Sequence, residues 1–204
     1  MGKHSSERKS GKGKKVFFVL IFLILLVAIG IVIYNNIINK QTPEDSINNA
    51  FQAMKSYDVD NANKYIDYNQ LIYSLDEMLV QGKNEGVCKE LFKDIEWKVE
   101  NTEVNNDKAT AIVEVTNKDF IKVMTNWMKK IIGEKAKGNQ ITIDVSLQKL
   151  ENALSETGEV TTVMKKINLI KEDDTWKIVV DEELRSLVYP SIDSVATALT
   201  QSGN

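Results

Sequence analysis

Hydrophobic and polar positions along the chain follow three patterns in succession. Residues 16–34, VFFVLIFLILLVAIGIVIY, form an uninterrupted run of 19 residues without a charge. Between residues 43 and 92 the apolar positions recur every third or fourth residue, which is typical of amphipathic helices. Around residues 95–115 and 160–180 they recur at every second residue instead, which indicates strands with one buried face. The order therefore predicts an apolar segment followed by an α+β domain.

The apolar run has the length of a membrane-spanning helix. At about 1.5 Å per residue, 19 residues cover roughly 28 Å, close to the roughly 30 Å hydrocarbon core of a bilayer. We predict a transmembrane helix over residues 16–38. A cleaved signal peptide is disfavoured because bulky residues occupy the positions where small ones are needed for cleavage. The expected membrane-anchor residues are Val16, Phe17, Leu20, Leu25, Ile33 and Tyr34.

The distribution of charge predicts the orientation of this helix. Residues 1–15 carry a net charge of +5, whereas the whole chain carries −3, so the remainder carries −8. Basic segments stay on the cytoplasmic side of a membrane. We therefore expect a single-pass protein of the cell membrane with a disordered cytoplasmic tail (1–15), a stalk (39–42), an external domain (43–190) and a partly helical C-terminal tail (191–204). The residues expected to set this topology are Lys9, Lys12, Lys14 and Lys15.

Helices are predicted at the start of the external domain. Thr42 is a suitable N-cap, Pro43 suits the first helical position, and Asp45 completes a capping box. The following stripe consists of Ile47, Ala50, Phe51 and Met54. Further helices are expected over residues 58–66, from about residue 69 to Gly82, and over residues 87–92.

Two hairpins with a helical insertion between them are predicted in the rest of the domain. The first joins residues 94–104 to 109–115, and the second joins 159–171 to a strand that contains Trp176, Ile178 and Val180. The insertion comprises a helix over 119–138 and another over 144–154, and residues 140–143 could form a short strand. The chain should be helical again up to Tyr189 and break at Pro190. This order fits helices packed on a four-stranded antiparallel sheet.

Composition excludes several kinds of site. The only histidine, His4, lies in the basic tail, so the domain lacks an imidazole for a catalytic triad or a metal site. The chain contains no glycine-rich phosphate loop, and the acidic domain lacks the charge needed to bind nucleic acid. We expect no cofactor and no metal ion. The single cysteine, Cys88, should pack in the core, although a reactive thiol or an intermolecular bridge is an alternative.

Carboxylates and aromatic side chains provide the remaining candidates for a site. Asp58, Asp60 and Asp67 are near four tyrosines, at 57, 65, 68 and 73, and could act as acid or base in a pocket. The favoured alternative is that these are cap and turn positions, a role for which Asp58, Asp60 and Asn69 are suitable. The acidic turn 172–174 could hold a cation or be solvated. The stripe around Trp127 could line a cavity, bind a protein or belong to the core. The candidate pocket residues are Tyr65, Asp67, Trp97 and Trp127.

Two segments carry a resemblance to a known fold family. They are TPEDSINNAFQAMKSYDVDNANKYI and KKINLIKEDDTWKIVVDEELRSLV. They resemble the nuclear-transport-factor-two-like, or cystatin-like, cone domains of bacterial membrane-anchored proteins that are described as lumazine-binding-like. The resemblance implies a cone-shaped sheet around an opening helix. The helical insertion is longer than the minimal fold requires, which leaves the geometry of any inherited pocket open.

Three functions are compatible with these observations. The first is a non-catalytic module of the cell envelope that binds a small ligand or a protein. The second is a scaffold subunit of a conjugation or type IV secretion-like assembly, which would share the basic tail, single span and external domain. The third is an enzyme that uses a carboxylate in the cone, for which the sequence offers no positive signal. The first is the leading hypothesis, with the lipid bilayer as a partner of the N-terminal helix and a protein of the envelope as a further candidate partner.

Overall fold

The computed structural model describes residues 12–33, 41–79 and 85–190. The chain divides into two compact units, residues 1–40 and 41–204. The first unit contains helix α1 (Lys12–Ile33), in which side chains are described for residues 20–31. Among the described residues, no helix has both the length and the apolar character needed to cross a membrane. Helix α1 covers residues 16–33 of the predicted span, and residues 34–38 lie outside the described ranges. The expectations for Lys9, Tyr34, Gly82 and the C-terminal tail concern residues outside the described ranges.

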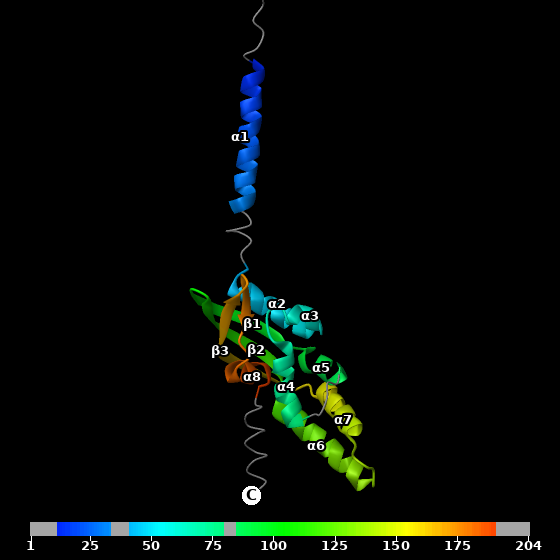
Figure 1. The fold of residues 1–204 in the computed structure, drawn as a ribbon. Helices are drawn as coiled ribbons and strands as arrows, with labels where there is room; N and C mark the ends of the chain where they lie inside the picture. The colour runs from blue at the N-terminus through cyan, green and yellow to red at the C-terminus, as the bar shows by residue number, and fades with distance from the viewer. Residues whose placement is uncertain (1–11, 34–40, 80–84, 191–204) are drawn as a thin grey trace, which may run out of the picture. The chain divides into compact units, whose positions relative to one another are not determined.

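The second unit begins with the predicted helices (Figure 1). Helix α2 (Pro43–Lys55) has the expected capping box, in which the side chains of Thr42 and Asp45 each accept a hydrogen bond from the other residue's backbone. Its predicted stripe is buried: Ile47, Ala50, Phe51 and Met54 are at most 1% exposed. Helices α3 (Val59–Ala62), α4 (Tyr68–Leu79) and α5 (Glu85–Phe92) follow.

A four-stranded antiparallel sheet with strand order β1-β2-β3-β4 confirms the predicted α+β class. Strand β1 (Glu96–Asn105) pairs with β2 (Lys108–Lys118), with a bulge between Val99 and Asn101. Strand β3 (Val160–Glu172) pairs with β2 along its length, whereas β4 (Thr175–Ile178) is short. In the β3–β4 turn, Asp173 and Asp174 both have positive φ, as a tight hairpin of this kind requires.

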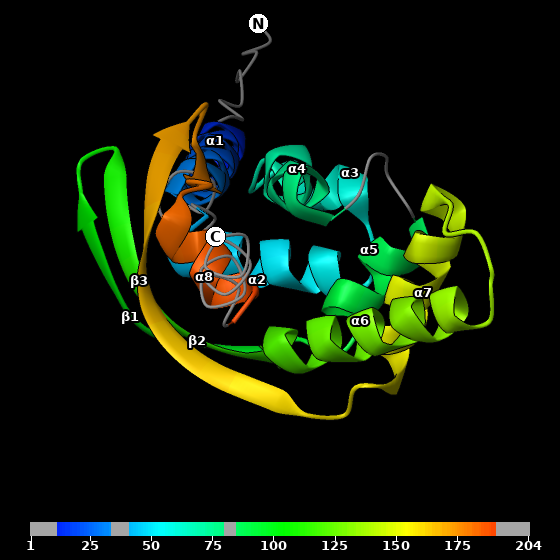
Figure 2. The same ribbon diagram turned by 90° about the horizontal axis from the view of Figure 1, so that it is seen from below.

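Helices α6 (Phe120–Ala136) and α7 (Ile143–Glu156) are inserted between β2 and β3 and pack side by side, as both views show (Figures 1 and 2). Helix α8 (Glu182–Val188) follows β4. Figure 2 shows that the sheet is strongly curved and that α2 and α8 lie on its concave side. The largest fully buried side chains of the core include Phe51, Phe92, Phe120 and Tyr189. Cys88 is also buried in this core, as predicted.

Two predicted bounds are wrong, and one alternative does not occur. The helix predicted over 58–66 ends at Ala62, because the Ile178 N–H donates to the Tyr65 carbonyl at 2.7 Å and draws this segment against β4. The last strand ends at Ile178 and excludes Val180, since the chain turns into α8. Residues 140–143 form no strand; Thr142 instead caps α7. Along α6, Met124 is buried and Trp127 is partly buried, whereas Met128 is exposed.

Candidate functional site

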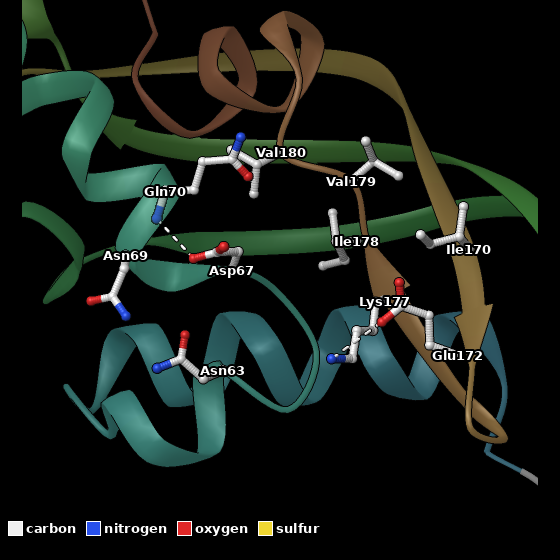
Figure 3. Close-up of a pocket in the computed structure, with 10 residues that line it drawn as sticks. All are labelled: Asn63, Asp67, Asn69, Gln70, Ile170, Glu172, Lys177, Ile178, Val179 and Val180. Atoms are coloured by element: carbon white, nitrogen blue, oxygen red, sulfur yellow. Dashed lines mark hydrogen bonds and ion pairs between the residues drawn. The ribbon is translucent and has the colours of Figure 1, made fainter.

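A groove of about 580 Å³ lies between the beginning of α4 and the β3–β4 hairpin (Figure 3). Its walls come from segments that are about 100 residues apart in the chain. The link between α3 and α4 contributes one wall, and strands β3 and β4 with the two residues after β4 contribute the other. The lining residues are Asn63, Asp67, Asn69, Gln70, Ile170, Glu172, Lys177, Ile178, Val179 and Val180.

The α4 wall of this groove is polar. It presents three carboxamide side chains, those of Asn63, Asn69 and Gln70, together with the carboxylate of Asp67. This wall is held by the local fold. The Asp67 carboxylate accepts a hydrogen bond from the Gln70 backbone N–H at 2.9 Å, and the side-chain Oδ1 of Asn63 accepts one from the Tyr68 backbone N–H at 3.1 Å. Asp67 thus has the role of the N-cap of α4 that sequence reasoning assigned to Asn69.

The opposite wall is mainly aliphatic. Ile170, Ile178, Val179 and Val180 line this wall (Figure 3). An ion pair also lies on this wall, with 3.4 Å between Lys177 Nζ and the Glu172 carboxylate. Because these two charges offset each other, the Asp67 carboxylate gives the groove a net negative charge. The arrangement suits a neutral or cationic ligand that has hydrogen-bonding groups on one side and apolar groups on the other.

The structure does not bring the four predicted pocket residues together. Asp67 lines the groove, whereas Tyr65 lines a second, smaller hollow of about 300 Å³ on the α2–α3 side. Trp97 stands on β1, where its ring packs on Phe51 with 5.6 Å between centroids and its Nε1 donates to Asn48 Oδ1 at 2.9 Å. Trp127 stands on α6, and its Nε1 donates to the Ser146 carbonyl on α7 at 3.0 Å.

The tyrosines and aspartates near residue 60 have structural surroundings. Tyr68 is buried against Phe92, and burial raises the pKa of its hydroxyl far above the ordinary value. Asp58 caps α3, and hydrogen bonds from the side chain and backbone of Asn61 lower the pKa of its carboxyl. A hydroxyl that holds its proton and a carboxyl that loses it easily are both poorly matched to acid–base chemistry near neutral pH.

The acidic turn between β3 and β4 is paired with lysines. The Asp174 carboxylate lies 2.9 Å from Lys171 Nζ, and the Glu172 carboxylate forms the ion pair with Lys177 described above. No group of three or more potential metal ligands is found within residues 12–33, 41–79 and 85–190. The hypothesis of a cation at this turn thus gains no support from the described geometry.

The residues that sequence reasoning missed are the carboxamides Asn63, Asn69 and Gln70 of the polar wall. Three amide side chains within eight positions were the available signal in the sequence. It was not informative alone, because asparagines around short helices are ordinary capping and turn residues.

Comparisons with known proteins give no family for the chain. No protein-family model matches it, and no curated protein matches it. A crystal structure of YcdA, a proposed lipoprotein of Bacillus subtilis, is similar at 22% sequence identity with a TM-score of 0.32. The similarity covers 50% of this chain and 34% of YcdA, so the chain spans about a third of that protein's length.

Proposed function

We propose that residues 41–204 form a non-catalytic binding module, and that its groove between α4 and the β3–β4 hairpin takes an amide-bearing ligand. The observation that carries this proposal is that three carboxamides and one carboxylate line one wall of the groove, whereas the residues of the other wall are mainly aliphatic. Carboxamides donate and accept hydrogen bonds at once and therefore pair well with other amides. Two sources share this chemistry, namely a peptide segment of a protein and an acetamido sugar.

The test is ligand-observed NMR on the full chain, with an N-acetylated dipeptide amide and N-acetylglucosamine as separate probes. Saturation transfer to one or both probes is expected from the wild-type chain. The paired substitution Asn69→Ala and Gln70→Ala should abolish the transfer, because it removes two of the three amides of the wall. The matched control is Gln52→Ala, which changes an amide in the smaller hollow and should retain the signal.

The result for each probe identifies the source of the ligand. Transfer to the dipeptide alone indicates a protein segment, and transfer to the sugar alone indicates a glycan. The proposal is wrong if neither probe receives saturation, or if the Gln52→Ala variant loses the signal together with the groove variant. The substitution Asp67→Asn keeps a capping side chain for α4 while it removes the negative charge. Saturation transfer in this variant therefore shows whether binding depends on the charge, without a change in the fold of the groove.

We also infer that the N-terminal unit anchors the protein to a cell membrane with the second unit outside. The support is the uncharged run of 19 residues and the net charge of +5 in front of it. In helix α1 the apolar side chains from Leu20 to Leu26 are all exposed, which is costly for a helix in water. Protease added to intact cells should degrade residues 41–204. If degradation occurs only after lysis, the orientation is wrong. If alkaline carbonate releases the protein from the membrane fraction, helix α1 is not embedded in the bilayer.

The classification as a cone domain remains part of this proposal. The features that favour it are the curved four-stranded sheet and the helices α2 and α8 on its concave side (Figure 2). The two-helix insertion α6–α7 exceeds what the resemblance requires. An experimental structure of residues 41–204 in which the sheet is flat would rule out this classification.

A further inference from the structure

Helix α6 has an apolar face that nothing in the described structure covers. Its inner face, with Phe120, Val123 and Met124, is buried. A second row, Ile121, Met128 and Ile132, is exposed by 42%, 45% and 61%. Spacings of seven and four residues place the three side chains on one side of the helix. We call this row the α6 stripe.

Lysines border the α6 stripe. Lys122 and Lys129, seven residues apart, form a row along its solvent flank, and Lys135 continues the stripe three residues beyond Ile132. All three are exposed. Within the part of the chain that the structure describes, these lysines have no ion-pair partner, whereas the neighbouring Lys130 and Lys137 are paired with Glu156 and Glu134. Their charges are therefore available to an external group.

The size of the stripe argues against a second copy of the chain as its occupant. A stable protein interface covers roughly 800 Å² on each partner. Three partly exposed side chains do not supply a core for such an area. A lipid surface needs no complementary shape, because a helix lies in the interface with its aliphatic side chains among the acyl chains and its lysines at the phosphates. Long lysine side chains reach the headgroups from such a position.

We propose that the α6 stripe and Lys122, Lys129 and Lys135 form a contact site for an anionic lipid surface. The apolar row enters the boundary between headgroups and acyl chains, and the three ammonium groups lie at the lipid phosphates. The contact depends on anionic lipid and weakens with salt, because exposed charges are screened within about 10 Å at 0.1 M salt. The site is separate from the groove and does not require that α1 spans a membrane.

The test is an environment-sensitive fluorophore at Met128 in the full chain. The variant Met128→Cys is labelled with nitrobenzoxadiazole and added to nanodiscs of phosphatidylcholine alone or of phosphatidylcholine with phosphatidylglycerol in equal amounts. The wild-type chain, carried through the same labelling, corrects for any reaction at the buried Cys88. The matched control is the same label at Met164→Cys on β3, since Met164 is 52% exposed and lies outside the stripe.

A blue shift and a gain in intensity at position 128 are expected in discs with phosphatidylglycerol, and both should be lost at high salt. The control label at position 164 should keep the emission of a probe in water. The triple substitution Lys122→Gln, Lys129→Gln and Lys135→Gln should abolish the shift at position 128 while circular dichroism shows that the helices persist. Repeating the measurement at Ile132→Cys guards against a local effect of the first label.

Three outcomes would overturn the proposal. Equal emission at position 128 in both kinds of disc would mean that anionic lipid is not recognised, which is also the result if the stripe binds an acidic protein. An equal shift at position 164 would indicate general adsorption. A shift that needs two chains in one disc would assign the stripe to a second copy. If the chain also binds discs of phosphatidylcholine alone, that binding is assigned to α1 and is measured separately from the shift at position 128.

Discussion

The ammonium group of Lys118 lies 2.8 Å from the Asp94 carboxylate, although the lysine side chain is only 5% exposed. Lys118 ends β2, and Asp94 precedes β1, so the pair joins the two ends of the first hairpin. A buried ammonium is costly unless it is paired. Asp94 is 53% exposed, so water screens part of the attraction from its side.

Because Lys118 is buried and Asp94 is not, removal of Asp94 alone should lower the free energy of unfolding more than removal of both partners. Asp94→Ala should lower the free energy of unfolding by about 1–2 kcal/mol, because it leaves a buried charge without its carboxylate. Adding Lys118→Met to that variant should restore most of the loss. Denaturant titration of the two variants and the wild type measures the difference. Equal stability of the single and double variants would contradict the account.

The stability contributed by the Lys118–Asp94 pair should depend on pH. The hydrogen bond from Lys118 lowers the pKa of the Asp94 carboxyl below its ordinary value. A carboxyl with a depressed folded pKa stabilises the protein above its unfolded pKa of about 3.9, and this contribution is lost as the pH falls through the folded value. The gap in unfolding free energy between the wild type and Asp94→Asn should therefore be constant above about pH 5 and shrink below about pH 4. A gap that widens toward acid would refute this assignment.

Truncation of Asn117 should lower the free energy of unfolding more than the loss of Asp94 does. Its buried amide donates to the Leu91 carbonyl at 3.2 Å and the Val188 carbonyl at 2.9 Å, and its oxygen accepts from the Lys118 backbone at 2.9 Å. Asn117→Ala would remove all three of these buried hydrogen bonds, at a cost of about 2–3 kcal/mol. Thermal and denaturant unfolding measure the loss. The exposed Asn105→Ala is the control and should change stability by less than about 0.5 kcal/mol.

Trp176 tests the assignment of β4. The side chain is 5% exposed and belongs to the core. Trp176→Ala should lower the free energy of unfolding by about 3–5 kcal/mol through lost contacts and a cavity. The control is Tyr73→Ala, because Tyr73 is 60% exposed on α4. If the melting temperature of Trp176→Ala matched that of the wild type, the closing strand would be wrongly placed.

Glu134 near the end of α6 should titrate at unusually low pH. Hydrogen bonds from Asn139, Lys149 and Lys137 lower the pKa of its carboxyl to about 2. NMR titration of the glutamate carboxyl carbons checks this value. Asn139→Ala should move the pKa toward the ordinary value of about 4.3, because it removes the first of these partners. Lys135→Ala, which changes a lysine outside this group of hydrogen-bond partners, should leave the titration unchanged.

The sequence by itself determined which elements form and where several of them begin. A helix or strand follows from local periodicity, and a cap follows from residues within three or four positions of each other, as Thr42 and Asp45 show. Hence the opening helix, both hairpins and the two inserted helices occur where they were predicted, with bounds that differ by one or two residues. The uncharged run in front of them needs only its own composition to be recognised.

Only the tertiary structure decided which of these elements meet. The pairing of Ile66 with Ile178 ended α3 early and formed the groove, although 112 positions separate the two residues. Periodicity places Met124 and Met128 one turn apart on α6, yet Met124 is buried in the core and Met128 is 45% exposed. Local patterns state which side chains share a face of an element. What covers that face depends on contacts between distant segments, and these exist only once the chain has folded.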